Sequence, residues 1–343
     1  MKKVLDIVEP IVSTYTQHAY LQSVLLCNEE TKGWLYSNYI QMFLNKDLEK
    51  TSWGDFYFPM PYEQRCYESC KWLRVQKIER TYVSELFPDP LDYVKDCIDR
   101  KYYVHTFINY YYVSKSRHFG KKNRMHDCLF YGYDEEEQVL YCADFMFANT
   151  RFSHEKMTFE EFRLAFVKEN VETDNILFNF VYSFSLKEHS SYAYNRGNII
   201  YGLKNYLESS VPEYWRGYNY DNQNDIVWGL NCYDVYIDYI SNHDLEIDIR
   251  MLHMFMEHKK IMVERIIFLN EESEIENVER FISEYEEMYT DLYKVINLVL
   301  KYNICKKTDI KSKICDILSK VRIKEEKCLI DMLNALNSEK YNF

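Results

Sequence analysis

A histidine and an aspartate occupy the two strands of a predicted β-hairpin. The segment MHDCLFYGYDEEEQVLYCADF predicts a strand over 125–131, a turn over 132–137 and a strand over 139–145. Antiparallel pairing then brings His126 and Asp144 side by side on one face. A carboxylate beside an imidazole fixes its tautomer and stabilises its cation, as a Cys–His nucleophilic site requires. The alternative is a histidine that is merely hydrogen-bonded within its strand.

Cys27 is the cysteine best placed in the sequence for nucleophilic attack, because an amphipathic helical pattern over 29–44 begins just after it. A helix N-terminus and a nearby imidazolium lower the pKa of a thiol. We therefore predict a catalytic triad of Cys27, His126 and Asp144, with the sulfur within about 4 Å of the imidazole. Gln22, five residues earlier, is the candidate oxyanion donor. The alternative is that Cys27 is a small buried hydrophobe.

The loop over 115–124 is basic and directly precedes His126. Such a loop is ordinarily only solvated. On a chain with a net charge of −12 it is also suited to attract a phosphopantetheine arm or an acidic carrier protein. Its four cations nearest the histidine are Arg117, Lys121, Lys122 and Arg124.

Composition excludes several classes of function. Lys and Arg total 42 against 54 Asp and Glu, so the net charge is negative. A nucleic-acid-binding protein is expected to carry positive charge that neutralises phosphates. No apolar run is long enough to span a membrane and no signal peptide is recognisable, so we expect a cytoplasmic protein without a membrane partner. The ten cysteines are then expected to be mostly reduced. Cys66 and Cys70 lack a second Cys/His pair at ligand spacing, so no metal is predicted.

The aromatic content is high, with 33 Tyr and 20 Phe beside 8 Gly. Tyrosines bury their rings while their hydroxyls need partners, which favours a half-polar interior or groove. A coding bias of an AT-rich genome would produce the same composition without any function.

Hydrophobic periodicity predicts an α+β fold with a helical C-terminal portion. We expect a catalytic portion over 1–175 and a mostly helical portion over 176–343 that forms a substrate cap or acceptor site. Helices are predicted over 14–26, 29–44, 61–74, 88–100, 158–170 and 198–209, strands over 102–113 and 176–187, and a polar aromatic loop over 212–225. Beyond residue 227 long helices are predicted to break near 242–243, 270–273 and 302–309.

The hairpin also resembles a known family. Its run H-D-x-L-x-x-G-Y-D followed by A-D-F is similar to the His and Asp strands of papain-like cysteine proteases, notably the double-glycine leader peptidases, and of the butirosin acyltransferase N-terminal domain. The interval of 99 residues from Cys27 to His126 is similar to that of these families. More closely, the chain resembles cysteine-protease homologues of thiotemplated biosynthesis, the family of the amide-forming enzyme of closthioamide biosynthesis. The resemblance is clearest over 102–170.

This resemblance implies a papain-like fold with an antiparallel sheet and an acyltransferase activity. Cys27 would take an acyl or peptidyl group from a carrier-protein thioester, and an amine deprotonated by His126 would then receive it as an amide. Phosphopantetheine on the carrier protein would deliver the substrate, with no other cofactor. The alternatives are a cysteine protease or thioesterase, in which water replaces the amine, and a non-catalytic papain-fold binding module.

Selectivity between an amine and water must come from residues outside the triad. Polar aromatic side chains are densest over 110–114 and over 214–220. We therefore predict that Tyr111 and Ser114 contact the substrate, together with the second of these stretches.

Overall fold

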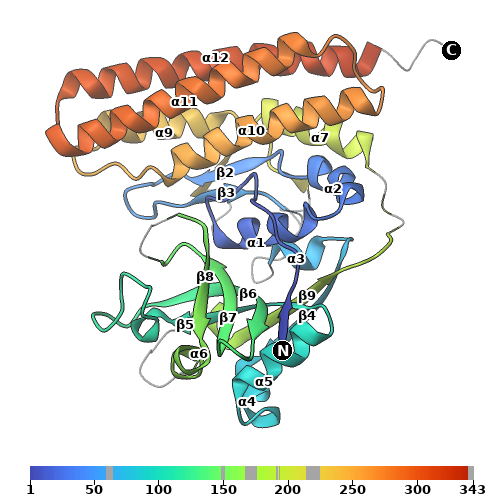
Figure 1. The fold of residues 1–343 in the computed structure, drawn as a ribbon. Coiled ribbons are helices and arrows are strands. Elements are labelled where there is room, and N and C mark those ends of the chain that lie inside the picture. The colour runs from blue at the N-terminus through green and yellow to red at the C-terminus, as the bar shows by residue number, and fades with distance from the viewer. Residues whose placement is uncertain are drawn as a thin grey trace. The chain divides into compact units, whose positions relative to one another are not determined.

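The computed structural model describes residues 1–58, 65–147, 151–166, 176–190, 192, 194–213 and 225–338. The chain divides into two compact units (Figure 1). The first, which we call the sheet unit, comprises Met1–Thr31 and Met60–Tyr192; the second, the helical unit, comprises Lys32–Pro59 and Ala193–Phe343. The units are interleaved along the chain, so the division differs from the predicted boundary after residue 175.

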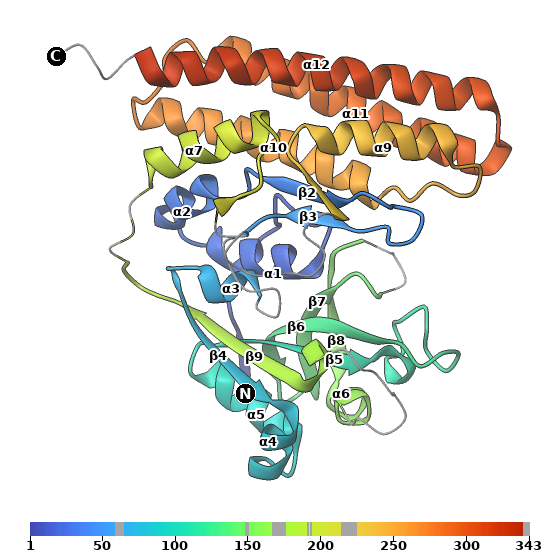
Figure 2. The same cartoon turned by 180° about the vertical axis from the view of Figure 1, so that it is seen from behind.

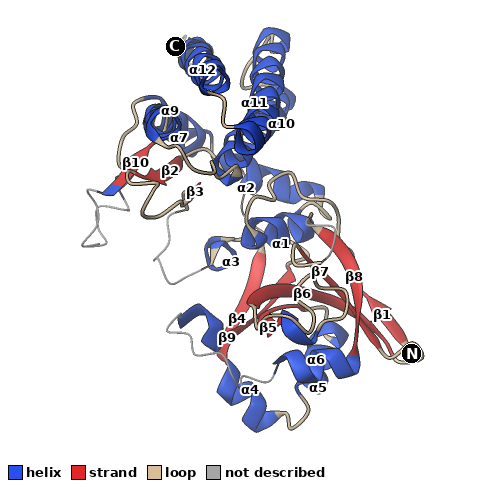
Figure 3. Cartoon of the chain, turned by 90° about the vertical axis from the view of Figure 1, so that its left-hand side faces the viewer, coloured by secondary structure: helices blue, strands red, loops and turns tan. Residues whose placement is uncertain are grey.

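The described part of the sheet unit forms a seven-stranded antiparallel sheet in the order β4-β9-β5-β6-β7-β8, with β1 paired to β6. Helix α1 lies against one face, and α4, α5 and α6 lie on the other (Figure 3). The strands are β1 (Lys2–Val4), β4 (Leu73–Glu79), β5 (Tyr103–Asn109), β6 (Met125–Asp134), β7 (Val139–Asp144), β8 (Ser153–Thr158) and β9 (Phe180–Leu186). The helices are α1 (Thr16–Leu25), α3 (Cys66–Ser69), α4 (Arg80–Leu86), α5 (Pro90–Asp99) and α6 (Phe159–Phe166), with 3-10 turns η1 (Glu29–Thr31), η2 (Tyr110–Tyr112) and η3 (Ile176–Asn179).

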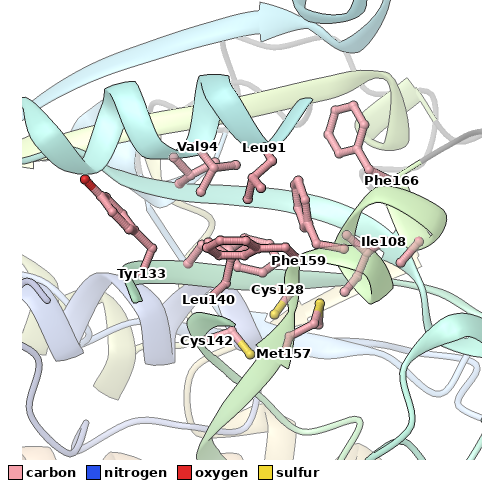
Figure 4. Packing of buried hydrophobic residues seen from close by; sticks show 14 of the residues in the cluster. Leu91, Val94, Ile108, Cys128, Tyr133, Leu140, Cys142, Met157, Phe159 and Phe166 are labelled. Carbon is pink, nitrogen blue, oxygen red and sulfur yellow. The ribbon is translucent and has the colours of Figure 1, made fainter. Parts of the chain in front are cut away.

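Alternate residues of β5, β6, β7 and β8 form a buried core with α5 and α6 (Figure 4). Because side chains alternate across a strand, the intervening residues face α1. His105 is one of these, and its ring lies 5.3 Å from that of Tyr20 in α1. The core side is apolar, with Leu91, Val94, Ile108, Cys128, Leu140, Cys142, Met157, Phe159 and Phe166 among its buried members.

Capping residues mark the N-termini of α5 and α6, the two helices of this core. The Asp89 side chain accepts a hydrogen bond from the backbone N–H of Leu91 at 3.1 Å, and Pro90 begins α5. A capping box begins α6, where a helix is predicted: the Glu161 N–H donates to Thr158 Oγ1 at 3.1 Å, and the Thr158 N–H donates to Glu161 Oε2 at 2.8 Å.

The predicted hairpin is present as β6 and β7, but its register differs. Leu129 is opposite Ala143, and continuing that pairing places Asp144 opposite Cys128 rather than His126. A bulge follows between Phe130 and Gly132. Residues two apart on a strand point to the same face of the sheet. His126 therefore still shares a face with Asp144, as predicted.

The helical unit contains a small antiparallel sheet and long helices that run alongside one another (Figures 1 and 2). Its elements are α2 (Lys32–Ser37), β2 (Met42–Asn45), β3 (Gly54–Phe56), α7 (Arg196–Leu207), β10 (Ile226–Trp228), α9 (Asn231–Asn242), α10 (Arg250–Glu271), α11 (Glu279–Cys305) and α12 (Thr308–Ser338). The three predicted breaks between C-terminal helices are confirmed. Among the described residues, no helix is both long and apolar enough to cross a bilayer.

Candidate active site

His126 and Asp144 meet at the ends of β6 and β7, as predicted. His126 Nδ1 lies 3.3 Å from Asp144 Oδ2 and 3.2 Å from Asp127 Oδ1, and it is 3.1 Å from the backbone carbonyl oxygen of Asp127. These three oxygens only accept hydrogen bonds, so Nδ1 carries a proton. Nε2 is then the nitrogen that changes protonation state, on a side chain that is 22% exposed.

Asp144 is fully buried and held by three donors. The Tyr110 hydroxyl donates to Oδ2, and the backbone N–H of Phe145 donates to Oδ1 at 2.6 Å. The Tyr20 hydroxyl lies 3.4 Å from Oδ1 and 3.1 Å from the Asp127 carbonyl oxygen. These contacts fix the carboxylate, and through it the orientation of the His126 ring.

Asp127 links this pair to α1 and to a second histidine. Its Oδ2 accepts a hydrogen bond from the Thr16 hydroxyl at 2.7 Å and lies 3.0 Å from His105 Nε2. The Tyr67 hydroxyl is 3.1 Å from His105 Nδ1. Because a carboxylate only accepts, His105 donates from Nε2 and accepts from Tyr67. Thr16 is the first residue of α1, so the N-terminus of α1 lies beside the carboxylate.

The two histidines have opposite electrostatic behaviour. Burial alone would lower the pKa of His126, but the carboxylates of Asp144 and Asp127 outweigh it and raise that pKa to about 9. Burial lowers the pKa of His105 below its usual value despite the hydrogen bond to Asp127. Burial would raise the pKa of Asp127, but the His126 cation and the contact with His105 lower it. At neutral pH the site therefore holds a His126 imidazolium between two carboxylates, and a neutral His105.

Cys27 does not join this group. It follows the C-terminal end of α1, whereas the N-terminal end contacts Asp127. The ten residues of α1 separate its two ends by about 15 Å. Cys27 is an exposed residue whose thiol lies 3.3 Å from the Ser23 carbonyl oxygen, and partial desolvation together with the charge of Asp6 raises its pKa. The prediction that Cys27 completes a triad with His126 and Asp144 is therefore wrong.

The triad fails because Cys27 follows the end of α1 that is remote from Asp127. The helix predicted over 29–44 is also shorter than expected, although helical turns do begin just after Cys27. The structure has a 3-10 turn and the six-residue helix α2 there, followed by strand β2. The Arg265 guanidinium, fully buried, donates to the carbonyl oxygens of Tyr36 at 2.8 Å, Asn38 at 2.6 Å and Tyr39 at 3.1 Å. Tyr39 adopts a left-handed conformation with φ 53°, which ends the helical path. A long-range cation thus replaces the helix that the periodicity predicted.

Gln22 has a structural position. Its Oε1 accepts hydrogen bonds from the backbone N–H groups of Ile11 at 3.0 Å and Val12 at 2.9 Å. The side chain is fully buried. Its Oε1 therefore attaches the N-terminal segment to α1, and full burial keeps its Nε2, the group that would donate to an oxyanion, away from a substrate.

The structure places the two predicted substrate-binding residues, Tyr111 and Ser114, in contact with residues other than His126. The Tyr111 N–H donates to Asn109 Oδ1 at 3.1 Å in η2, and the ring of Tyr111 is half-buried against Tyr112. Ser114 is exposed, and its N–H donates to Glu161 Oε1 at 2.8 Å. The second predicted stretch, 214–220, lies outside the described residues.

Neither a reactive thiol nor a metal cluster supplements the site in the part of the chain that is described. Cys128 is buried near Asp144, and burial raises the pKa of its thiol well above the usual value. No group of three or more His, Cys, Asp or Glu suited to hold a metal occurs among the described residues. A cavity of about 420 Å³ lies within the helical unit, between α7 and the chain around Tyr39 and Tyr57. None of the predicted site residues that the structure describes lines it.

Sequence reasoning missed the partners that complete the site: Thr16, Tyr20, Tyr67, His105 and Tyr110. Two signals point toward them. The predicted strand over 102–113 contains a histidine, and tyrosine hydroxyls are expected to find buried partners. The pairing of β5 with β6 and the position of α1 are needed to connect them, and neither follows from a local pattern.

Comparison with protein-family models finds no match for this chain, and comparison with curated proteins finds none either. The functional assignment therefore depends on the geometry around His126 and on the resemblance of the hairpin sequence.

Proposed function

We propose that the sheet unit is a papain-like acyltransferase that forms an amide from a carrier-protein thioester and an amine, without a cysteine intermediate. The observation that carries the proposal is the His126–Asp144 pair, with Nδ1 held by acceptors and Nε2 left for chemistry. Support for a papain-like fold comes from the antiparallel sheet and from the N-terminus of α1, which contacts Asp127 next to His126 in the sequence. Thr16 occupies the helix N-terminus where a nucleophilic cysteine is expected, and its hydroxyl is bound to Asp127.

In this mechanism the amine attacks the thioester carbonyl carbon directly. His126 Nε2 takes the proton of the attacking nitrogen as the C–N bond forms. When the C–S bond breaks, the imidazolium returns that proton to the departing thiolate sulfur. Asp144 and Asp127 stabilise the imidazolium between the two transfers. The amide and the free carrier thiol are the products, so no other reactant is needed.

The proposal predicts amide formation that is independent of Cys27. An acyl-pantetheine thioester incubated with a panel of amines and diamines is expected to yield amide with one or a few of them, because a bound amine gains effective molarity over water. Cys27→Ala is expected to retain this activity, and intact-mass measurement is expected to show no acyl group on the wild-type thiol. Free acid as the main product, or cleavage of ordinary peptides, would instead support the hydrolase alternatives. Loss of amide formation in Cys27→Ala would restore the covalent mechanism.

The activity is predicted to rise with pH until the His126 imidazole is neutral. With a pKa of about 9, about 1% of the imidazole is neutral at pH 7, so kcat/KM should rise about tenfold per pH unit below pH 8. Aniline is the acceptor of choice, because it is neutral throughout this pH range. The pH dependence of kcat/KM then reports ionisation of the enzyme and not of the amine. Asp144→Asn removes one of the two charges that raise the pKa, so its inflection should move to lower pH. Identical inflections in the two proteins would contradict the assignment of His126 as the base.

A non-catalytic binding module is the second candidate. The observation that favours it is that Cys27 lies away from the site and the thiol near Asp144, Cys128, is buried with a raised pKa, while the Thr16 hydroxyl is held by Asp127. Such a module would bind the acyl-pantetheine thioester and yield neither amide nor acid with any amine.

A further inference from the structure

Four cations near His126 have no carboxylate partner among the described residues: Arg117, Lys121, Lys122 and Arg124. The loop's other cation, Lys115, forms an ion pair with Glu155 at 2.6 Å. The stretch 115–126 contains five Lys and Arg and no Asp or Glu, in a chain that has 54 acids against 42 bases. The four side chains belong to exposed residues. A concentration of unneutralised charge on an acidic protein favours an anionic ligand over simple solvation.

Hydrogen bonds attach this loop to the candidate active site. The Gly120 N–H donates to the Tyr111 carbonyl oxygen at 2.9 Å, and the Arg124 N–H donates to Asn109 Oδ1 at 3.2 Å. The Tyr110 N–H in turn donates to the Arg124 carbonyl oxygen at 2.9 Å. Tyr110 is the residue whose hydroxyl binds Asp144. Both the middle and the end of the loop are thus fixed on η2, beside the His126–Asp144 pair.

The charges of the loop act together. Burial lowers the pKa of His118, and the positive charges of Arg117, Arg124, Lys122 and His126 lower it further. His118 therefore lies within the electrostatic reach of three loop cations and of the His126 imidazolium. We call the exposed loop cations together with the adjacent His126 the cationic rim: Arg117, Lys121, Lys122, Arg124 and His126.

We propose that the cationic rim binds the phosphate of a phosphopantetheine acyl donor, with its four loop cations on the phosphate and His126 at the thioester. This inference rests on the proposed acyl transfer. A phosphopantetheine thioester carries its phosphate and its reacting carbonyl at opposite ends of the arm. Guanidinium and ammonium groups both bind phosphate oxygens through charge-assisted hydrogen bonds.

Binding tests the inference without requiring turnover. Isothermal titration compares S-acetyl-phosphopantetheine, S-acetyl-pantetheine and inorganic phosphate against the full chain at low salt. We expect the phosphorylated thioester to bind about tenfold or more tightly than the unphosphorylated one. That advantage should shrink as salt is added, because the rim is exposed. Inorganic phosphate should bind more weakly than the phosphorylated thioester.

Charge reversal tests which residues are responsible. In Lys121→Glu/Lys122→Glu/Arg124→Glu the advantage of the phosphorylated thioester should disappear. The control variant replaces three exposed lysines of the helical unit by glutamate, namely Lys301, Lys307 and Lys320. It changes the net charge by the same amount and should keep the affinity advantage of the phosphorylated thioester.

The outcomes separate the two proposals. Equal affinity for both thioesters, or an advantage that survives reversal of the loop charges, would overturn the phosphate site even if amide formation is observed. Inorganic phosphate binding as tightly as the phosphorylated thioester would overturn the assignment to the acyl donor. A phosphate-dependent affinity that requires the rim, without amide formation from any amine, would support the site and reject the proposed transfer.

Discussion

Replacing His126 by glutamine should lower kcat/KM for amide formation by about 10²- to 10⁴-fold, the range that general acid–base catalysis contributes. Glutamine keeps a polar side chain between the carboxylates of Asp144 and Asp127 but takes no proton from the amine. The measurement is the initial rate of amide formation from an acyl-pantetheine thioester and the preferred amine. A catalytic effect should appear in kcat/KM while the affinity for the thioester changes little.

A histidine outside the site, His154 on the same sheet, supplies the control. His154 lies on β8 and is paired with Glu9 at 3.4 Å, on a side chain that is 29% exposed. His154→Gln should leave the rate within about twofold of wild type, since a surface ion pair contributes little. Thermal unfolding of both variants shows whether His126→Gln lost its activity through unfolding. Equal rates for His126→Gln and wild type would remove His126 from the mechanism and favour the binding module.

The hairpin that carries the His–Asp pair was predictable because its information is local. Alternating apolar residues and a turn define both strands, and a register error of two residues left His126 and Asp144 on a shared face. The capping residues Asp89 and Thr158 likewise mark helix starts through short-range hydrogen bonds. These elements are specified by patterns within about twenty consecutive residues.

The environment of Cys27 was not predictable because it depends on long-range contacts. The helix expected after it is cut short where Arg265, more than two hundred residues later, binds three carbonyl oxygens. Long-range pairing also explains why the two units are interleaved along the chain: β2 of the helical unit pairs with β10, which lies far away in the sequence. The carboxylate network around Asp127 also joins α1, β5 and β6. No local pattern reports such pairings.

The helical unit contains a buried ion pair whose removal should have the largest effect on stability. Lys259 of α10 and Glu325 of α12 are fully buried and form an ion pair. The Tyr233 hydroxyl donates to Glu325 Oε2 at 3.1 Å, and the Lys259 ammonium donates to His258 Nδ1 at 2.9 Å. His258 donates from Nε2 to the Ile40 carbonyl oxygen at 2.9 Å, which leaves Nδ1 as the acceptor. Every charge in this network thus has partners.

Glu325→Ala should lower the free energy of unfolding by about 3–5 kcal/mol, because it leaves the Lys259 ammonium buried without its carboxylate. For a unit of this size, that loss corresponds to a fall in Tm on the order of 10 °C. Differential scanning calorimetry measures it. Asp291→Ala, which breaks the exposed pair with Lys294 at 2.8 Å, is the control and should cost less than about 1 kcal/mol.

The double replacement Lys259→Met/Glu325→Leu distinguishes two causes of instability: a buried ammonium left without its carboxylate, and the loss of contacts between α10 and α12. Both side chains then remove a charge and retain apolar volume, so the desolvation penalty of the pair disappears together with its attraction. If the cost of Glu325→Ala comes from the unpaired ammonium, the double variant should unfold close to wild type or above it. If instead the network of Tyr233, His258 and the two charges is needed to pack α10 against α12, the double variant should be as unstable as Glu325→Ala. We expect the first result, because burial already lowers the pKa of Lys259 despite its carboxylate partner, which means that its charge is held at a cost.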